Sequence, residues 1–230
     1  MSQIPPNSFA IAIDGPGGVG KSTIARKVAA NLDITYIDTG AMYRAVALHC
    51  IRQNIDITDE AVVSQLLPNI NIGLTHKNGQ QFISLNGEDI TSDIRTQAIS
   101  DATSVIAAYS AVRAKMVVIQ QCFAASNHVV MDGRDIASQV LPWAQLKIYL
   151  DAHVDVRARR RTCEMDAKGQ PANFETIREE ISLRDQRDKT RTNNPLIHTP
   201  DAVYIDNGDM TIAEQVDKIS ALARPFMQNI

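Results

Sequence analysis

Apolar residues along this chain fall into short continuous runs that alternate with longer stretches of helical period. Five runs have the length and composition of buried strands, over residues 9–14, 34–38, 128–132, 146–151 and 202–206. Between most of these runs apolar residues recur every three or four positions, as they do from Ser22 to Leu32. This alternation predicts an α/β fold, in which helices flank a parallel β-sheet.

The middle of the chain has a different pattern. Asn78-Gly79 lies between two segments of alternating polarity, and Asn86-Gly87 offers a second tight turn. We therefore expect a small antiparallel insertion at about residues 56–95 on the parallel core. The pattern leaves open whether this insertion is a structural appendage or helps to shape a substrate site.

Two helical regions follow the insertion. The first covers residues 96–125, with a break expected near Tyr109-Ser110. The second, residues 152–192, predicts two charged helices around a loop at 168–171. This predicted helical hairpin carries eight arginines, namely Arg157, Arg159, Arg160, Arg161, Arg178, Arg184, Arg187 and Arg191.

A glycine-rich motif connects the first predicted strand to the first predicted helix. Its sequence, GPGGVGKST, fits the P-loop pattern G-x-x-x-x-G-K-[ST]. Glycines let backbone N–H groups surround phosphate oxygens, Lys21 adds a positive charge, and the Ser22 hydroxyl can bind Mg²⁺. Because the loop also opens a helix, the phosphates would lie at a helix N-terminus. The motif predicts a P-loop NTPase fold with nucleotide phosphates bound by Gly15, Pro16, Gly17, Gly18, Val19, Gly20, Lys21, Ser22 and Thr23.

The length, composition and net charge of the chain indicate which classes of protein it can belong to. A chain of 230 residues, 44% of them hydrophobic, can bury its own core, so we expect one domain over residues 1–230. No run approaches the ~20 apolar residues of a membrane span, and the first ten residues lack the features of a secretory signal. A net charge of −3 gives no general attraction to nucleic acid. We expect a cytoplasmic protein without nucleic-acid or membrane partners.

Cysteine and histidine spacing indicates neither disulfides nor a zinc site. The three cysteines, Cys50, Cys122 and Cys163, are odd in number and far apart. The five histidines lack the paired spacing that zinc ligands require.

Acidic residues end all five predicted strands. Four of them are considered as a group, namely Asp14, Asp38, Asp132 and Asp151. In open α/β sheets ligands bind at the carboxyl ends of the strands, so this group of aspartates is a candidate site. An aspartate at such a position can equally cap a helix or form a turn.

The arginines of the predicted hairpin suit phosphate chemistry. Phosphoryl transfer needs positive charge where negative charge spreads in the transition state, which makes this hairpin a candidate lid. Arg184, Asp188 and Arg191 have the spacing i, i+4 and i+7 and are expected on one helix face. Most of the other arginines, including those of the run RARRR, are expected to be solvated and paired with acidic residues.

Two strand-to-helix turns carry further candidates. In YIDTGAMYRAV, Arg44 follows a strand by one helical turn. In DGRD, residues 132–135, Arg134 suits a phosphate and a neighbouring carboxylate suits an exocyclic amine. The alternative for DGRD is a turn that contains a local ion pair.

At this point five segments together resemble the bacterial cytidylate kinases of the longer type. They are GPGGVGKST, DTGAMYR, SDIRTQAISDATSVIAAYSAVR, DGRD and RDQRDKTR, and the resemblance spans residues 9 to about 220. It implies transfer of the γ-phosphoryl group of ATP to CMP or dCMP, with ATP and Mg²⁺ as cofactors. We expect a monomer in which residues 39–125 bind the nucleoside monophosphate and residues 152–192 form the lid.

The resemblance also implies roles for single residues. Catalytic residues would be Lys21, Arg134, Arg184 and Arg191, and Ser22 would hold the metal. Substrate would be bound by Thr39, Arg44, Ser104, Arg113, Asp132, Arg134, Asp135, Arg184, Asp188 and Arg191. Among these, Ser104, Arg113 and Asp135 would recognise cytosine, while Arg184 and Asp188 would bind the sugar. Thr39 replaces a serine that is common in the family.

The residues alone leave three alternative functions open. A regulatory GTPase would share the P-loop, but DAKG (166–169) lies between two predicted helices and no N-K-x-D follows it. A nonenzymatic nucleotide-binding protein is the second alternative. The third is a kinase for another monophosphate such as UMP or AMP, which the fold cannot exclude.

Overall fold

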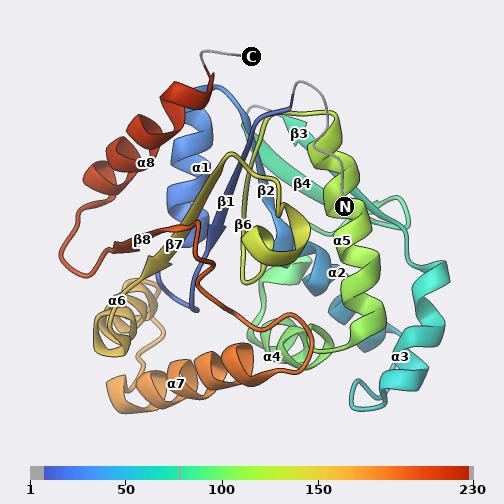
Figure 1. Ribbon diagram of the computed structural model, residues 1–230. Helices are drawn as coiled ribbons and strands as arrows, with labels where there is room; N and C mark the ends of the chain where they lie inside the picture. Colours follow the sequence, from blue (N-terminus) through green and yellow to red (C-terminus); the bar gives the residue numbers. More distant parts are fainter. Residues whose placement is uncertain (1–7, 78, 228–230) are drawn as a thin grey trace.

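The parallel sheet has five strands in the order β2-β6-β1-β7-β8 (Figure 1). The computed structural model describes residues 8–77 and 79–227. All five predicted strands are confirmed to within one residue: β1 (Ala10–Asp14), β2 (Thr35–Asp38), β6 (Val129–Gly133), β7 (Leu146–Asp151) and β8 (Val203–Asp206). Because β1 is central, the loop that follows it lies in the middle of the carboxyl edge of the sheet.

Helices connect the strands as the apolar periods predicted. They are α1 (Lys21–Leu32), α2 (Thr39–Arg52), α3 (Glu60–Leu66), α4 (Gln97–Ile106), α5 (Ser110–Ala125), α6 (Val154–Asp166), α7 (Phe174–Thr190) and α8 (Ile212–Met227). Shorter turns are η1 (Leu67–Asn69), η2 (Asp93–Arg95) and the π-helical η3 (Ile136–Val140). The predicted break near Tyr109-Ser110 and the predicted loop at 168–171 are both confirmed.

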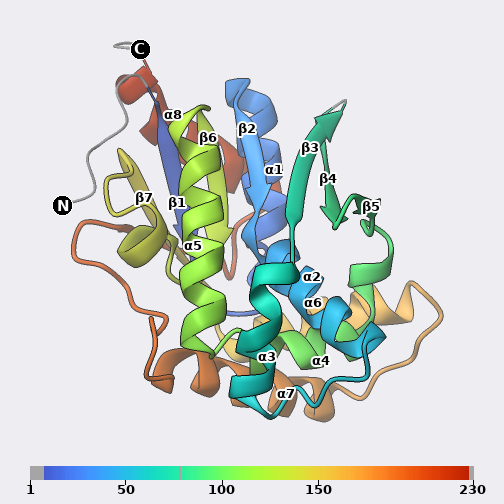
Figure 2. The same ribbon diagram turned by 90° about the vertical axis from the view of Figure 1, so that its right-hand side faces the viewer.

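Two apolar clusters hold helices against opposite faces of the sheet. Alternate residues of β1 point to opposite sides, so Ile11 and Ile13 pack with α1 and α8. Ala10 and Ala12 belong to the second cluster, which contains residues of α2 and α5. Figure 2 shows α5 in front of the sheet, with α1 and α8 behind it.

The predicted insertion is a separate antiparallel sheet of β3 (Ile72–Lys77), β4 (Gln80–Leu85) and β5 (Glu88–Asp89). Its second turn is confirmed, because Asn86 and Gly87 both have positive φ, 52° and 89°. Of the first turn, Asn78 lies outside the described residues and Gly79 has φ 72°.

Side chains of the insertion contact β2, an edge strand of the parallel sheet. The Gln81 amide accepts from the Asp38 N–H at 2.8 Å and donates to the Asp38 carbonyl at 3.4 Å. The His76 ring bonds to the Tyr36 carbonyl at 2.7 Å. Figure 2 shows β3 and β4 beside β2. These bonds cover open backbone groups of the edge strand and tie the insertion to the start of α2.

Across the described part of the chain, no one helix combines the length and apolar character needed to cross a membrane. The pair α4 and α5 reaches that length and composition only together, with a bend of 103° between them.

The exit from β1 requires glycine. Gly15 has φ 154°, and a Cβ atom there would lie 2.0 Å from the Leu150 carbonyl oxygen of β7.

We expect Gly15→Ala to lower the free energy of unfolding by about 3 kcal/mol or more, because neither backbone segment can move aside cheaply. Urea unfolding measures the change. Gly169→Ala is the matched control, because Gly169 also has positive φ (70°) but nothing lies within 4 Å of its added Cβ. An equal loss in both variants would contradict the steric explanation.

Candidate active site

Three carbonyls of the P-loop accept hydrogen bonds from side chains. Pro16 accepts from the Lys21 ammonium at 2.7 Å, Gly17 from Arg157 at 2.9 Å, and Val19 from Asn207 at 2.8 Å. In a planar trans peptide the following N–H points opposite to the carbonyl. The N–H groups that follow the Gly17 and Val19 carbonyls therefore point away from Arg157 and Asn207, and can bind an anion.

Helix α1 begins without a side-chain cap. Its N-cap is Gly20, which has a left-handed backbone conformation with φ 93° and makes no side-chain bond to the helix. The first N–H groups of a helix need partners and carry partial positive charge. The start of α1 therefore supports the phosphate site that the motif predicted.

Two arginines from distant segments lie over the P-loop at Gly17. Arg134, from the turn after β6, and Arg184, from α7, each place an atom 3.5 Å from the position of a Gly17 Cβ. Lys21 is buried on the same loop. The predicted convergence of loop, DGRD turn and helical hairpin is thus present in the structure.

The positive charges of Lys21, Arg134 and Arg184 repel one another. Burial, and then the charges of Arg134 and Arg184, lower the pKa of the Lys21 ammonium well below its ordinary value. Burial, and then the charges of Arg134 and Arg44, lower the pKa of Arg184 to about 10. A bound anion would relieve both shifts, so the cluster suits phosphate groups.

Asp188 provides negative charge at the edge of the cluster. Its carboxylate accepts from the Arg134 Nε at 2.7 Å. Burial acts to raise the pKa of Asp188, but the charges of Arg134, Arg184 and Arg191 together hold it below its ordinary value. Asp188 is therefore an ionised acceptor beside two of the predicted phosphate-binding arginines.

One detail of the predicted helix face is wrong. Helix α7 ends at Thr190, so Arg191 is the cap that follows the helix rather than a helical residue. Its φ of −60° still directs the side chain along the helical path, whereas its ψ of 141° turns the chain away. Arg191 therefore stays on the side of Arg184 and Asp188, and its Nε donates to the Asn194 carbonyl at 2.7 Å.

A second charged group lies next to the phosphate cluster. Arg113 and Asp135 form a buried ion pair, and Arg191 Nη2 lies 3.7 Å from the other Asp135 oxygen. Arg113 also donates to the Ala107 carbonyl at 2.9 Å and lies 5.4 Å from the centre of the Tyr43 ring. Arg113 Nε and Arg191 Nη2 are buried without a hydrogen-bond partner among the described residues. A buried donor without a partner is energetically costly. Such unpaired donors are typical of side chains that face a ligand site.

Asp132 lies on the P-loop side of the site. Its carboxylate accepts from the Ser22 hydroxyl and the Tyr36 hydroxyl, both at 2.8 Å. Burial, and then the nearby Asp38, raise the pKa of Asp132. The Thr39 hydroxyl donates to the Asp132 backbone carbonyl at 2.6 Å. The pairing of Ser22 with Asp132 brings together two oxygen ligands of the kind that Mg²⁺ prefers.

No cluster of three His, Cys, Asp or Glu ligands occurs within residues 8–77 and 79–227. A magnesium ion at Ser22 and Asp132 would therefore take its other ligands from nucleotide phosphates and water, which is the usual arrangement for this ion.

The family model of cytidylate kinase matches residues 11–225. The chain belongs to the cytidylate kinase family. Cytidylate kinase of Lysinibacillus sphaericus (strain C3-41) is 45% identical over 217 residues, covering 94% of this chain and 97% of that protein. Cytidylate kinase of Bacillus subtilis (strain 168) is 46% identical over 212 residues, covering 92% and 94%. A solved shikimate kinase from Bacteroides thetaiotaomicron has a TM-score of 0.46 and 14% identity, covering 93% and 97%. The family resemblance stated from the sequence is confirmed.

Within this cytidylate kinase family member, most predicted site residues meet around Gly17 and Asp135. Ser104 is half-buried on α4, and its hydroxyl forms no hydrogen bond among the described residues. Two of the strand-end aspartates have local roles instead. Asp38 caps α2 by accepting from the Ala41 N–H, and Asp151 accepts from the Ala152 N–H at 2.8 Å.

Arg157 is the residue that the sequence interpretation missed. It was expected among the solvated arginines, but its side chain is only 5% exposed and bonds to the P-loop. Arg160 is also bonded, to the Asn207 and Gly208 carbonyls at 2.8 and 3.1 Å. Consecutive arginines look alike in a sequence, so spacing could not separate these two from Arg159 and Arg161.

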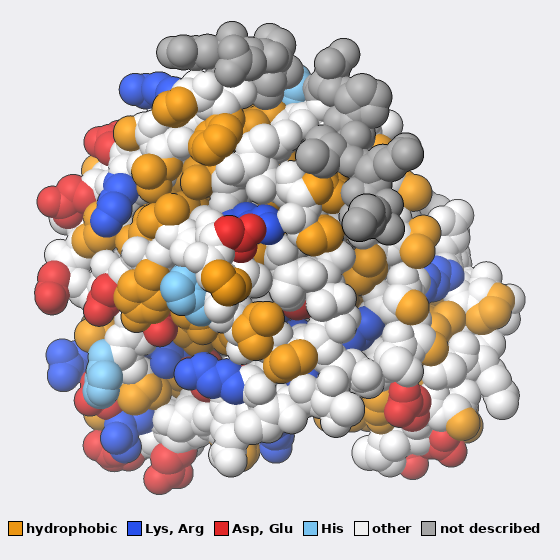
Figure 3. Space-filling model, in the orientation of Figure 1, with side chains coloured by type: hydrophobic (Ala, Val, Ile, Leu, Met, Phe, Trp, Pro, Cys, Tyr) orange, Lys and Arg blue, Asp and Glu red, His pale blue; other side chains and the backbone are white. Residues whose placement is uncertain are grey.

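Charged side chains of both signs gather over α6 and α7 (Figure 3).

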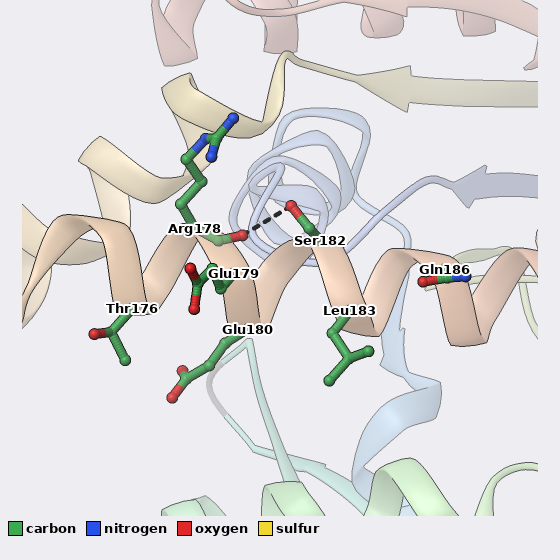
Figure 4. Close-up of a pocket in the computed structure, with 7 residues that line it drawn as sticks. All are labelled: Thr176, Arg178, Glu179, Glu180, Ser182, Leu183 and Gln186. Carbon is green, nitrogen blue, oxygen red and sulfur yellow. Dashed lines mark hydrogen bonds between the residues drawn. The ribbon is translucent and has the colours of Figure 1, made fainter.

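A hollow of about 570 Å³ borders the outer face of α7 (Figure 4). Its lining comes from this one helix: Thr176, Arg178, Glu179, Glu180, Ser182, Leu183 and Gln186. None of the predicted site residues lines it, so this hollow is not the candidate active site.

Asp14 connects the end of β1 to the DGRD turn. Its two oxygens accept from the Ile136 and Ala137 N–H groups at 2.9 and 2.8 Å. Burial outweighs these bonds and raises the pKa of Asp14 to about 6, from an ordinary value of 3.8. Between those two values the native state binds more protons than the unfolded state, so this group makes the protein less stable as pH rises.

We expect Asp14→Asn to remove this pH dependence. The wild-type minus variant difference in unfolding free energy should be about 2 kcal/mol larger at pH 4.5 than at pH 7.5, because an asparagine side chain does not titrate. Urea unfolding at the two pH values measures it. Asp217→Asn, an exposed position on α8, is the control and should show no such difference. A pH-independent difference for Asp14→Asn would contradict the raised pKa.

Proposed function

We propose that this protein transfers the γ-phosphoryl group of ATP to CMP or dCMP, giving ADP and CDP or dCDP. Family membership supports this activity. The observation that carries it is the meeting of two anion-binding groups at Gly17: the P-loop on one side, and Arg134 with Arg184 on the other. Phosphoryl transfer requires that a donor and an acceptor phosphate approach each other between positive charges.

On the donor side, the inward N–H groups of the P-loop would hold the ATP phosphates, and Lys21 would stabilise the charge on the transferring group. Ser22 and Asp132 would hold Mg²⁺. When bound, the ion neutralises charge between the phosphates of the nucleotide. Asp132 therefore belongs, in this proposal, with the donor rather than with the acceptor.

On the acceptor side, Arg44, Arg134 and Arg191 would bind the phosphate of the monophosphate. Arg184 would lie between donor and acceptor, and Asp188 would accept from a sugar hydroxyl. Thr39 would position the turn rather than donate to phosphate, because its hydroxyl hydrogen is already used on the Asp132 carbonyl. Substrate would then exchange some of the internal bonds, such as Arg134 with Asp188, for bonds to itself.

The Arg113 and Asp135 pair would select the base. A carboxylate can accept from the exocyclic amine of cytosine, and the free Arg113 donor can serve the ring nitrogen or carbonyl of the base. Uracil would place its O4 acceptor against the Asp135 acceptor and leave a buried group unpaired. Ser104 on α4 would contribute a further polar group at the base.

The regions of the chain follow from these roles. Residues 39–125 would form the part that binds the monophosphate, with the insertion fastened to it through Gln81 and Asp38. Residues 152–192 would form the lid. We further propose that the protein acts as a monomer in the cytoplasm, on small nucleotides alone.

An acceptor panel tests the proposed function. With ATP and Mg²⁺ fixed, CMP and dCMP should be good substrates, and UMP should have a kcat/KM lower by up to ~10⁴. AMP and GMP should be excluded by size. Lys21→Ala, the catalytic control, should fold normally and lose about 10²–10³ in kcat. Equal use of UMP and CMP, or a preference for AMP, would overturn the cytidylate assignment.

Asp135→Asn tests the origin of base selection. An asparagine can turn its amide to donate to uracil O4, so the CMP to UMP ratio of kcat/KM should fall at least ~10-fold. The change also leaves the buried Arg113 without its charged partner, so the thermal midpoint should fall, and rates are compared below it. Steady-state rates with each acceptor at saturating ATP measure the ratio. Asp217→Asn should leave the ratio unchanged. A parallel loss for both acceptors would show that Asp135 supports the fold but does not read the base.

A further inference from the structure

Arg157 contacts three segments of the site with its three guanidinium nitrogens. Nε donates to the Ala152 carbonyl and Nη1 to the Gly17 carbonyl, both at 2.9 Å, and Nη2 pairs with the Asp185 carboxylate at 2.7 Å. The segments are the end of β7, the P-loop and α7. A buried guanidinium bonded on all sides has little freedom to move, so it fixes these segments relative to one another.

Asp185 is the partner of Arg157 on α7, one residue after Arg184. One of its carboxylate oxygens pairs with Arg157, and the other is buried with no hydrogen-bond partner in the described chain. A buried charge pair with an unsatisfied oxygen gives poor stabilisation compared with an apolar contact. Stability alone therefore does not account for the pair.

Arg184 depends on its neighbours for its position. Among the described residues its side chain makes no hydrogen bond or ion pair, yet it lies against Gly17. Burial, and then the charges of Arg134 and Arg44, lower its pKa, while Asp188 and Asp185 act to raise it. Because no bond of its own fixes the side chain, its position over the P-loop depends on the placement of α7.

Two ion pairs fasten α7 at this point. Arg134 pairs with Asp188 on the side of the DGRD turn, and Arg157 pairs with Asp185 on the side of the P-loop. In the proposed function Arg134 and Asp188 both engage the acceptor, which would loosen their mutual bond. The Arg157 and Asp185 pair would then be the ion pair that ties α7 to the P-loop through the Gly17 carbonyl. Arg178 and Asp155 tie α7 to α6, and Ile181 of α7 packs near Gly18.

We propose that Arg157 and Asp185 are positioning residues of the transfer reaction. Together they hold Arg184 over the P-loop while substrate occupies the acceptor side. This inference rests on the proposed function. Neither residue need touch a nucleotide, since Arg157 acts through the Gly17 carbonyl and Asp185 through α7.

The test compares Arg157→Met, Asp185→Leu, Asp185→Asn and the double variant Arg157→Met with Asp185→Leu. Misplacing Arg184 by about 1 Å should lower kcat ~10²-fold in Arg157→Met and Asp185→Leu. In Asp185→Leu, which keeps the Arg157 bond to Gly17, the dissociation constant of ATP from free protein should change less than ~3-fold. Asp185→Asn keeps an acceptor for Arg157, so it should retain kcat within ~10-fold. The double variant should be no worse than the poorer single variant, because the two residues act as a unit.

Arg161→Met is the matched control on the same helix. Arg161 is 45% exposed and pairs only loosely with Glu164, at 3.6 Å. Its kcat should stay within twofold of wild type. All rates are measured below the unfolding temperature of each variant, and where Arg157→Met does not fold, the comparison of Asp185→Asn with Asp185→Leu decides.

Three results would overturn the inference. The first is a kcat near wild type in folded Arg157→Met or Asp185→Leu. The second is loss of ATP binding in Asp185→Leu, which would place the pair in the ATP site rather than in the positioning of Arg184. The third is additive losses in the double variant. If wild type itself fails to phosphorylate CMP, the proposed function fails and this inference with it, whereas an active wild type with unimpaired variants overturns only the inference.

Discussion

The hydrogen bonds to the P-loop carbonyls are the constraint on which the site depends. A loop with carbonyls pointing inward would repel phosphate, and glycines allow either orientation. Arg157 and Asn207 each bond one carbonyl, which favours the orientation in which the following N–H groups point to the other side. These donors come from α6 and from the segment after β8. The helical hairpin and the last strand therefore shape the loop as much as its own sequence does.

The same loop also collects buried positive charge, which is unfavourable without a counterion. The lowered pKa values of Lys21 and Arg184 express that cost. The folded state can keep these buried positive charges close together because ion pairs on both sides of α7 hold the helix in place. A bound phosphate then reduces the repulsion between these positive charges. In the same way, a preorganised site of positive charge stabilises a negatively charged transition state.

The sequence predicted the sheet well because each strand is a short apolar run bounded by a turn or an aspartate, a local signal. It also predicted the P-loop, since strand, glycines and helix are contiguous in the chain. It could not distinguish Arg157 from Arg161, because burial depends on what packs against each turn of α6 and that contact comes from α7 and the P-loop. For the same reason the sequence does not connect Asp132 with the P-loop: only the structure brings its carboxylate to the Ser22 hydroxyl, 110 residues away along the chain.

The turn after β6 explains how one short segment can serve both phosphate and base. Arg134 and Asp135 are consecutive, so their side chains leave the backbone in different directions: the guanidinium of Arg134 lies over Gly17, and the carboxylate of Asp135 pairs with Arg113. The next two N–H groups are held by the buried Asp14 carboxylate at the end of β1. In the proposed function, the base pocket is thereby fixed to the strand from which the P-loop emerges. A change that shifted this turn would displace Arg134 and Asp135 together, so it would disturb phosphate alignment and base recognition at once.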